Sequence, residues 1–156
     1  NQAGTVIGSK ALNSGIKVIC STTGSRAKEQ ARGLVLDIIG KTLKFFDLAV
    51  QISEEDVRIY DTYAGGGYGF MTPGKAEAIK LLAETEGLIL DPVYTGSAMA
   101  CLIDLCRQGV FKRSDVVVFI HTGGQAGLFP YRAPLKAYGM GATLPWTVPP
   151  WFPSTG

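Results

Sequence analysis

The sequence is poor in the residues that build metal centres and disulfide frameworks. Its 156 residues contain three cysteines and one histidine. The thiols of Cys20, Cys101 and Cys106 are odd in number and lack C-x-x-C spacing, and His121 alone cannot complete a zinc site with them. We therefore expect free thiols, no metal site and a reducing, cytoplasmic location.

Long apolar runs and blocks of like charge are also missing. The longest apolar runs, at residues 88–90 and 116–120, are far shorter than the about 18 residues that a membrane span requires. Fifteen basic and 13 acidic residues give a net charge of +2, and the basic ones are spread along the chain. This distribution leaves no electrostatic footprint for a polyanion. We expect no nucleic-acid partner, no membrane partner and no secretory leader.

What remains is the composition of a globular domain. Hydrophobic residues make up 46% and charged residues 18%, which excludes a disordered chain. The 20 glycines and 8 prolines follow no period, which excludes collagen and coiled coil. A compact chain of this size buries roughly 70% of its unfolded surface, so it needs no covalent staple.

Short apolar runs alternate with stretches of helical periodicity. The sequence predicts strands and helices, in chain order, at residues 17–21, 27–48, 57–60, 73–85, 96–108 and 116–120. Apolar runs without alternation are typical of strands that are buried on both faces. We therefore predict an α/β fold of three layers, αβα, around a mostly parallel sheet, with residues 116–120 as its clearest buried strand.

The two ends of the chain have a different character. Residues 4–8 predict a glycine turn that enters a short helix, and residues 129–142 predict a weak helix or a loop. Residues 144–156 hold four prolines and both tryptophans, so we expect an extended tail that packs against another surface. The predicted organisation is one domain over residues 1–143 followed by this tail.

Three loops are candidates for ligand binding, because ligands gather at the carboxyl ends of parallel strands. Gly4 and Thr5 can offer backbone donors and a hydroxyl to a phosphate, although an ordinary turn has the same pattern. Residues 121–124 place a hydroxyl and two unhindered glycines directly after an apolar strand, where a tight turn is the alternative. Tyr68 and Tyr94 can orient a substrate or pass a proton, or serve only in packing.

Residues 86–96, which read EGLILDPVYTG, and residues 119–124, FIHTGG, closely resemble the C-terminal half of the D-cysteine desulfhydrase and 1-aminocyclopropane-1-carboxylate deaminase family. Residues 67–69, GYG, also fall at the expected place. The resemblance runs from about Gly4 to Tyr131. It implies a pyridoxal-phosphate enzyme of amino-acid metabolism, a fold similar to the tryptophan synthase β subunit (fold type II), and a homodimer when complete.

The resemblance also implies how this chain would bind the cofactor. Gly4 and Thr5 match the end of the family's phosphate loop, although residues 1–3 depart from its usual Ser/Gly run. Thr122 matches the residue whose hydroxyl faces the pyridine nitrogen, with Gly123 beside it in the cofactor site. A neutral hydroxyl there leaves the nitrogen largely unprotonated and favours elimination.

Tyr68 and Tyr94 match the two catalytic phenols near the substrate, and Thr95 separates two branches of the family. Deaminases have a glutamate at the position of Thr95, whereas desulfhydrases resemble this chain and have threonine, so Thr95 is assigned to the cofactor site. The resemblance thus favours β-elimination of D-cysteine to pyruvate, ammonia and sulfide. A lyase for L-cysteate stays open because Arg132 and residues 146–151 could bind a sulfonate, and so does a deaminase.

The family's Schiff-base lysine lies in a Ser/Gly-Gly-Asn-Lys segment of its N-terminal half, and these 156 residues contain no such segment. Lys10, Lys75 and Lys112 occur in helix or turn contexts unlike it. The resemblance therefore implies the C-terminal portion of an enzyme for a small amino acid, inactive alone and completed by a missing N-terminal half or a partner fragment. The non-enzymatic alternative is a half-domain that binds a phosphorylated ligand or another subunit.

Overall fold

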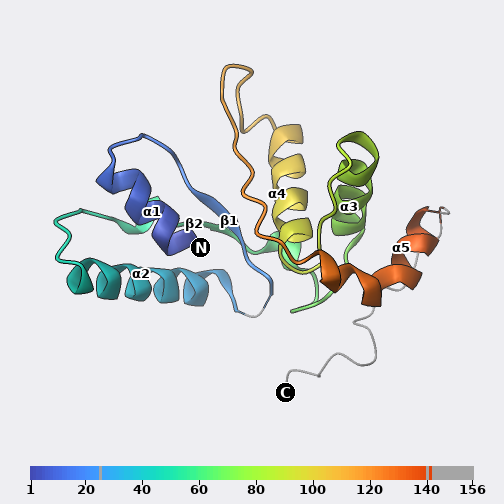
Figure 1. The fold of residues 1–156 in the computed structure, drawn as a ribbon, viewed down its shortest axis with the longest axis horizontal. Helices are drawn as coiled ribbons and strands as arrows, with labels where there is room; N and C mark the ends of the chain where they lie inside the picture. The colour runs from blue at the N-terminus through green and yellow to red at the C-terminus, as the bar shows by residue number, and fades with distance from the viewer. Residues whose placement is uncertain (25, 140, 142–156) are drawn as a thin grey trace.

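The chain folds into helices arranged around a short parallel sheet (Figure 1). The structure, a computed structural model, describes residues 1–24, 26–139 and 141. The elements are α1 (Gln2–Ala11), β1 (Ile19–Ser21), α2 (Lys28–Phe45), β2 (Arg58–Tyr60), α3 (Pro73–Thr85), α4 (Thr95–Arg107) and α5 (Arg132–Gly139), with 3₁₀ turns at Glu54–Asp56, Thr62–Ala64 and Gln125–Tyr131. Strands β1 and β2 pair in parallel, with Cys20 opposite Ile59. The predicted α/β class with a parallel sheet is confirmed.

The predicted helices are confirmed where apolar periodicity and boundary residues agree. Helix α3 has the predicted bounds, because Pro73 fits the first helical position and the hydroxyl of Thr72 accepts a hydrogen bond from the Lys75 amide at 3.3 Å. Helices α2 and α4 lie within the predicted ranges to within a few residues. Local signals were sufficient for these elements.

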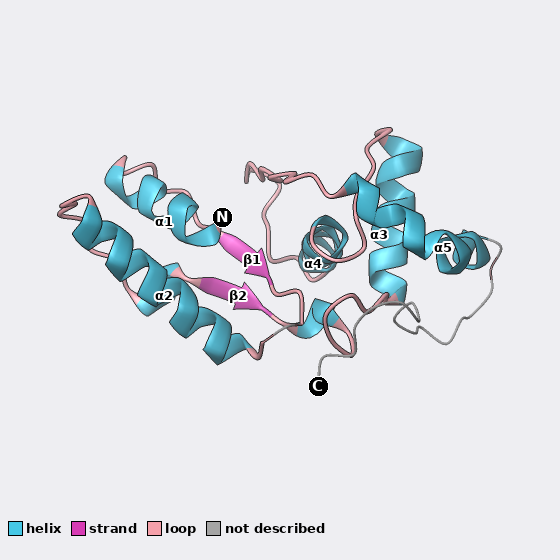
Figure 2. Ribbon diagram, turned by 60° about the horizontal axis from the view of Figure 1, so that its bottom comes forward, coloured by secondary structure: helices cyan, strands magenta, loops and turns pink. Residues whose placement is uncertain are grey.

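The hydrophobic core consists of two clusters. One joins α1, α2 and the strands through residues such as Val6, Ile39 and Ile59, and the other joins α3, α4 and the segment before α5. Figure 2 shows α1 and α2 running beside the two strands, with α3, α4 and α5 grouped at the other side. Ser97 of α4 links the two parts, because its hydroxyl lies 3.1 Å from the hydroxyl of Ser21 in β1.

The predicted strand at residues 116–120 is wrong for the structure as described. This segment forms no strand, and Val116 and Val118 are 91% and 78% exposed. A parallel strand needs neighbours to accept its backbone hydrogen bonds and to cover its faces. In the described ranges only β1 and β2 pair, so nothing there supplies such a neighbour.

The predicted glycine turn at residues 4–8 is also wrong, since these residues belong to α1. Ala3, Val6 and Ile7 recur at helical spacing and are buried, and this burial outweighs the about 1 kcal/mol that each helical glycine costs. Residues 129–139 continue a 3₁₀ turn into α5, as the weak-helix prediction allowed. The predicted tail at 144–156 lies outside the described residues, so the domain boundary stays a prediction.

No helix in the described ranges has the length and apolar character needed to cross a bilayer. The same part of the chain contains no group of three or more potential metal-binding side chains.

Candidate functional site

Asp91 is the centre of the candidate site. Its buried carboxylate accepts hydrogen bonds at Oδ1 from the amides of Val93 and Tyr94, at 2.8 and 2.7 Å, and at Oδ2 from the amide and hydroxyl of Thr95, at 2.8 and 2.6 Å. Pro92 favours the tight turn that brings these amides together, and a carboxylate at a helix N-terminus is stabilised by the helix dipole. Asp91 therefore fixes the start of α4 and the backbone of Tyr94.

Thr95 forms part of the buried wall of this site. Its side chain is 2% exposed, its hydroxyl donates to Asp91, and the same oxygen accepts the Asp91 amide at 2.8 Å. A glutamate in this place would put a second carboxylate beside Asp91 in a buried setting, which is unfavourable. The hydroxyl of Thr95 is hydrogen-bonded to Asp91 in this structure. Its cofactor-binding role remains a prediction.

Tyr68 and Tyr94 form a pair. Their hydroxyls share a short hydrogen bond, and their ring centroids lie 6.0 Å apart with the planes at 69°. Tyr94 is 51% exposed, so the pair borders solvent. The hydrogen bond to Tyr94, with partial burial, raises the pKa of Tyr68 to about 12. Tyr68 is therefore protonated at neutral pH, and the pair can hold a proton near a reacting atom.

The loop after residue 120 lies against the turn at Asp91. His121 Nε2 is 3.0 Å from the Ile89 carbonyl, and the Gly123 amide donates to His121 Nδ1 at 3.1 Å. Since Nδ1 accepts, Nε2 must carry the proton and donate to Ile89. His121 is thus a packed, hydrogen-bonded residue, as predicted.

Gly124 brings this loop closest to Asp91. Its φ is +91°, and a Cβ there would lie 2.8 Å from Asp91 Oδ2, so only glycine fits without displacement. Thr122 and Gly123 directly precede this contact. The structure therefore brings them to the turn that carries Tyr94 and Thr95, while their assigned roles stay predictions.

Gly4 and Thr5 lie in the first turn of α1, where Gly4 is exposed and Thr5 half-buried, next to Ala3 and Val6 of the other core cluster. The Thr5 amide donates to the Asn1 carbonyl at 3.1 Å, so the amides of residues 2–4 precede the first intrahelical hydrogen bond. Such amides and the positive end of the helix dipole suit a phosphate. In both views this end of α1 is the one nearer to α3–α5 (Figures 1 and 2).

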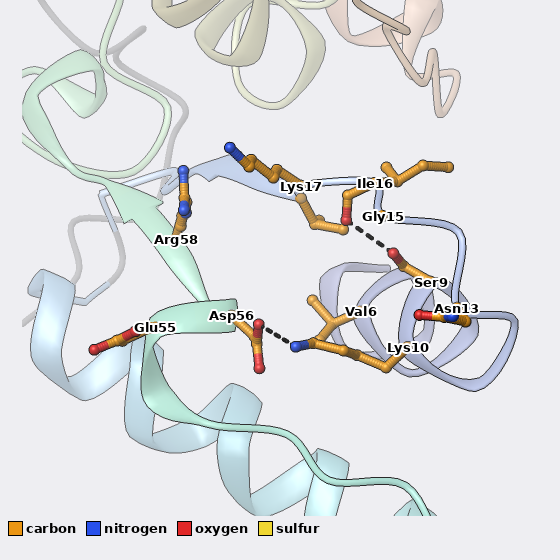
Figure 3. A pocket seen from close by; sticks show the side chains of 11 residues that line it. Val6, Ser9, Lys10, Asn13, Gly15, Ile16, Lys17, Glu55, Asp56 and Arg58 are labelled. Carbon is orange, nitrogen blue, oxygen red and sulfur yellow. Dashed lines mark hydrogen bonds and ion pairs between the residues drawn. The ribbon is translucent and has the colours of Figure 1, made fainter.

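A separate hollow of about 280 Å³ lies between α1 and the strands (Figure 3). Its lining includes Lys10, Lys17, Asp56 and Arg58, and none of the predicted site residues. Lys10 and Asp56 form an ion pair at 2.7 Å across it, which holds the pKa of Asp56 below its usual value. We assign no function to this hollow.

The comparison with protein families decides the family. Residues 1–123 match the model of the pyridoxal-phosphate dependent enzymes. The chain belongs to this family. Enzymes of this family depend on pyridoxal phosphate, so the predicted cofactor is confirmed. The family also confirms the predicted broad class, a pyridoxal-phosphate dependent enzyme.

Individual relatives agree with this assignment. A probable 1-aminocyclopropane-1-carboxylate deaminase of Cryptococcus neoformans is 38% identical over 131 residues, which cover 84% of this chain and 38% of the relative. A D-cysteine desulfhydrase of Salmonella newport is 50% identical over 76 residues, covering 49% of this chain and 23% of the relative. The crystal structure of a deaminase homologue superposes with a TM-score of 0.76 at 32% identity, covering 87% of this chain and 40% of that one. The chain spans about two fifths of the length of such relatives.

The described residues fit the family's cofactor. The amides of residues 2–4, which precede the first intrahelical hydrogen bond of α1, suit its phosphate, and the positive-φ glycines at 123 and 124 allow close approach of a flat ring beside Thr122. Sequence reasoning assigned no role to Asp91 or Lys75, and it named Gly124 only as one of two unhindered glycines. Asp-Pro before a helix is a turn signal that could have identified Asp91, whereas a lysine in the first turn of a helix usually indicates solvent exposure.

Proposed function

We propose that this chain supplies the C-terminal part of a pyridoxal-phosphate site in a lyase that converts D-cysteine and water to pyruvate, ammonia and hydrogen sulfide. The observation that carries the proposal is the meeting of the Tyr68–Tyr94 pair and the loop at residues 121–124 around Asp91. Such a pair can pass a proton to a leaving group, and the glycines allow a flat ring to approach the backbone closely.

Each part of the proposed site has its own task. The amides at residues 2–4 would hold the phosphate, and Thr122 would hold the pyridine ring through its hydroxyl. When bound, the cofactor supplies an electron sink for negative charge at the substrate α-carbon. The tyrosine pair lies near the substrate and holds a proton that the departing sulfur can take. The base that removes the α-proton comes from residues outside this chain.

Thr95 supports D-cysteine as the substrate over a ring-opening reaction. The resemblance assigns a glutamate at this position to the deaminases. In this chain the position is occupied by a buried threonine that is hydrogen-bonded to Asp91. The relatives named as deaminases keep the ring-opening reaction as the second candidate. The elimination of sulfite from L-cysteate is the third.

Exposed apolar residues support the proposal that the site is completed by a further segment or partner fragment. Val116, Val118 and Ile120 are 91%, 78% and 59% exposed in a segment with the composition of a buried strand. We propose that an N-terminal half covers this segment, that the complete protein is a cytoplasmic homodimer, and that the chain alone is inactive. A half-domain that only binds a phosphorylated ligand or a subunit is the non-enzymatic alternative.

The experiment combines the chain with the N-terminal half of its own reading frame, or uses the full-length protein, and supplies pyridoxal phosphate. Release of pyruvate and sulfide from D-cysteine, reduced at least tenfold by Tyr94→Phe and unchanged by Lys41→Met on the exposed side of α2, is expected. A cofactor-loaded assembly that forms a keto acid only from 1-aminocyclopropane-1-carboxylate, or only from L-cysteate, would assign it to that branch. Turnover of none of the three would contradict the proposal.

A further inference from the structure

Lys75 lies in the first turn of α3, and its side chain is completely buried. Its Nζ donates hydrogen bonds to the carbonyl oxygens of Ala64, at 3.1 Å, and Phe70, at 2.8 Å. These two residues flank residues 65–69, the segment that carries Tyr68, which we call the tyrosine loop. One ammonium group thus ties the two ends of the loop to the same helix.

The tyrosine loop needs such ties because its backbone is intrinsically mobile. Gly65, Gly67 and Gly69 have φ values of +75°, +149° and +76°. Glycine adopts such values readily, but its backbone also has more conformational freedom than that of other residues, and contacts are needed to restrict it. Further hydrogen bonds hold the loop, since the Tyr131 hydroxyl donates to the Gly69 carbonyl at 2.5 Å and the Phe70 amide donates to the Gly67 carbonyl at 3.2 Å. The Lys75 ammonium differs from these in bonding to both ends of the loop at once.

Asp91, which accepts the Tyr94 amide, also influences the pKa of Lys75. Burial lowers the pKa of Lys75 to about 8, and the negative charge of Asp91 acts in the opposite direction. Asp91 is the acceptor of the Tyr94 amide. Lys75 is thus hydrogen-bonded to the segment that carries one phenol and interacts electrostatically with the carboxylate that orients the other.

A buried charge is costly, and an apolar side chain could fill the same space without that cost. What an apolar side chain could not do is donate to two backbone carbonyls at once. Both bonds direct the ammonium towards the backbone of this chain. This orientation indicates a positioning role for Lys75.

We propose that Lys75 is a positioning residue that holds the tyrosine loop so that Tyr68 and Tyr94 stay hydrogen-bonded to each other. The consequence for turnover rests on the proposed function. The consequence for the phenols does not, because it can be measured on this chain without cofactor or substrate.

The test compares Lys75→Met with Lys80→Met in the 156-residue chain. Lys80 lies on the same helix, is exposed, and forms an ion pair with Glu84 at 2.5 Å, so its loss controls for removing a positive charge. Tyrosine labelled with ¹³C at the ring carbon next to oxygen is titrated by NMR, and Tyr68→Phe assigns the signal. We expect the pKa of Tyr68 to drop by at least one unit, a tenfold change in acidity, in Lys75→Met and to stay unchanged in Lys80→Met.

An unchanged pKa of Tyr68 in a folded Lys75→Met chain would overturn the proposal. If that variant does not fold, Lys75→Gln, which keeps an N–H donor, is titrated in its place. Failure of both to fold would also overturn it, since the lysine would then serve the fold as a whole. In the assembled enzyme, a lower kcat at unchanged KM for D-cysteine in the folded variant supports the role in turnover. A fall in the pKa of Tyr68 without any loss of turnover would leave the positioning intact and contradict only the proposed function of the pair.

Discussion

Replacing Asp91 by asparagine is the perturbation that best separates this site from an ordinary helix start. Both carboxylate oxygens accept from two donors each, namely the Val93 and Tyr94 amides at Oδ1 and the Thr95 amide and hydroxyl at Oδ2. An asparagine keeps one acceptor oxygen and must place its NH₂ group against the donors on the other side. At least one buried amide therefore loses its partner in either orientation.

The magnitude follows from these contacts. A hydrogen bond to a charged acceptor contributes about 1.5–3 kcal/mol, and a carboxylate at a helix N-terminus contributes about 0.3–1 kcal/mol more. We expect Asp91→Asn to lower the free energy of unfolding by about 2–4 kcal/mol, against a total of about 5–15 kcal/mol for a domain. In the orientation that turns the NH₂ group towards Val93 and Tyr94, Tyr94 also loses its backbone anchor, and the pKa of Tyr68 should then drop from about 12.

Urea unfolding followed by circular dichroism measures the first effect, as a lower midpoint at an unchanged slope. Asp37→Asn is the matched control, because Asp37 forms an exposed ion pair with Lys41 on α2. Its loss should change stability by no more than about 0.5 kcal/mol. A loss of stability for Asp91→Asn as small as that of the control would refute the central place of Asp91 in the site.

Three further outcomes are expected. Gly124 has a φ of +91°, and an added Cβ would lie 2.8 Å from a buried carboxylate oxygen, so Gly124→Ala should destabilise the chain by about 1–3 kcal/mol in the same urea assay. Gly33→Ala in α2, with open space around it, should be neutral or stabilising. Equal effects of the two substitutions would contradict the close contact at Gly124. The pKa of Lys75 in the folded chain, about 8, lies below its ordinary value of 10.5, so the unfolded chain binds more protons than the folded chain between these pH values. The stability of the wild type relative to Lys75→Met should therefore rise from pH 8 to 10.5 by about 1.4 kcal/mol for each pH unit. A stability difference that does not change with pH would show that the lysine is not buried as described. Tyr94→Phe should bring the pKa of Tyr68 down from about 12 towards 10 in an ultraviolet titration, and a value that stays near 12 would show that the hydrogen bond between the two is not its main cause.

The helices could be predicted from sequence because their signals are local. Pro73 after Thr72 marks the start of α3, and the apolar spacing within 27–48 marks α2, so neither depends on distant contacts. Residues 116–120 have an equally clear apolar pattern. That pattern indicates only that the segment is suited to burial in a sheet, and the described residues contain no strand that pairs with it.

The candidate site shows the same division. The sequence singles out Tyr68, Tyr94 and Thr122, whose roles stay predictions, but no sequence pattern predicted that Asp91 would bind three successive amides or that Gly124 would pack against it. Lys75 could not be predicted as buried, because its environment comes from the carbonyls of a glycine-rich loop 5 to 11 residues earlier. Such contacts follow from tertiary packing.

The most direct test of the central claim, that the loop at residues 121–124 and the tyrosine pair border one pyridoxal-phosphate ring, is the protonation of that ring's nitrogen. The assembled protein is loaded with cofactor labelled with ¹⁵N in the ring, and the nitrogen is observed by NMR in the wild type and in Thr122→Asp. With a neutral hydroxyl facing it, the nitrogen should be unprotonated in the wild type and become protonated in the variant, because a carboxylate stabilises the charged form. An identical ¹⁵N resonance position in both proteins, with cofactor bound, would contradict the claim.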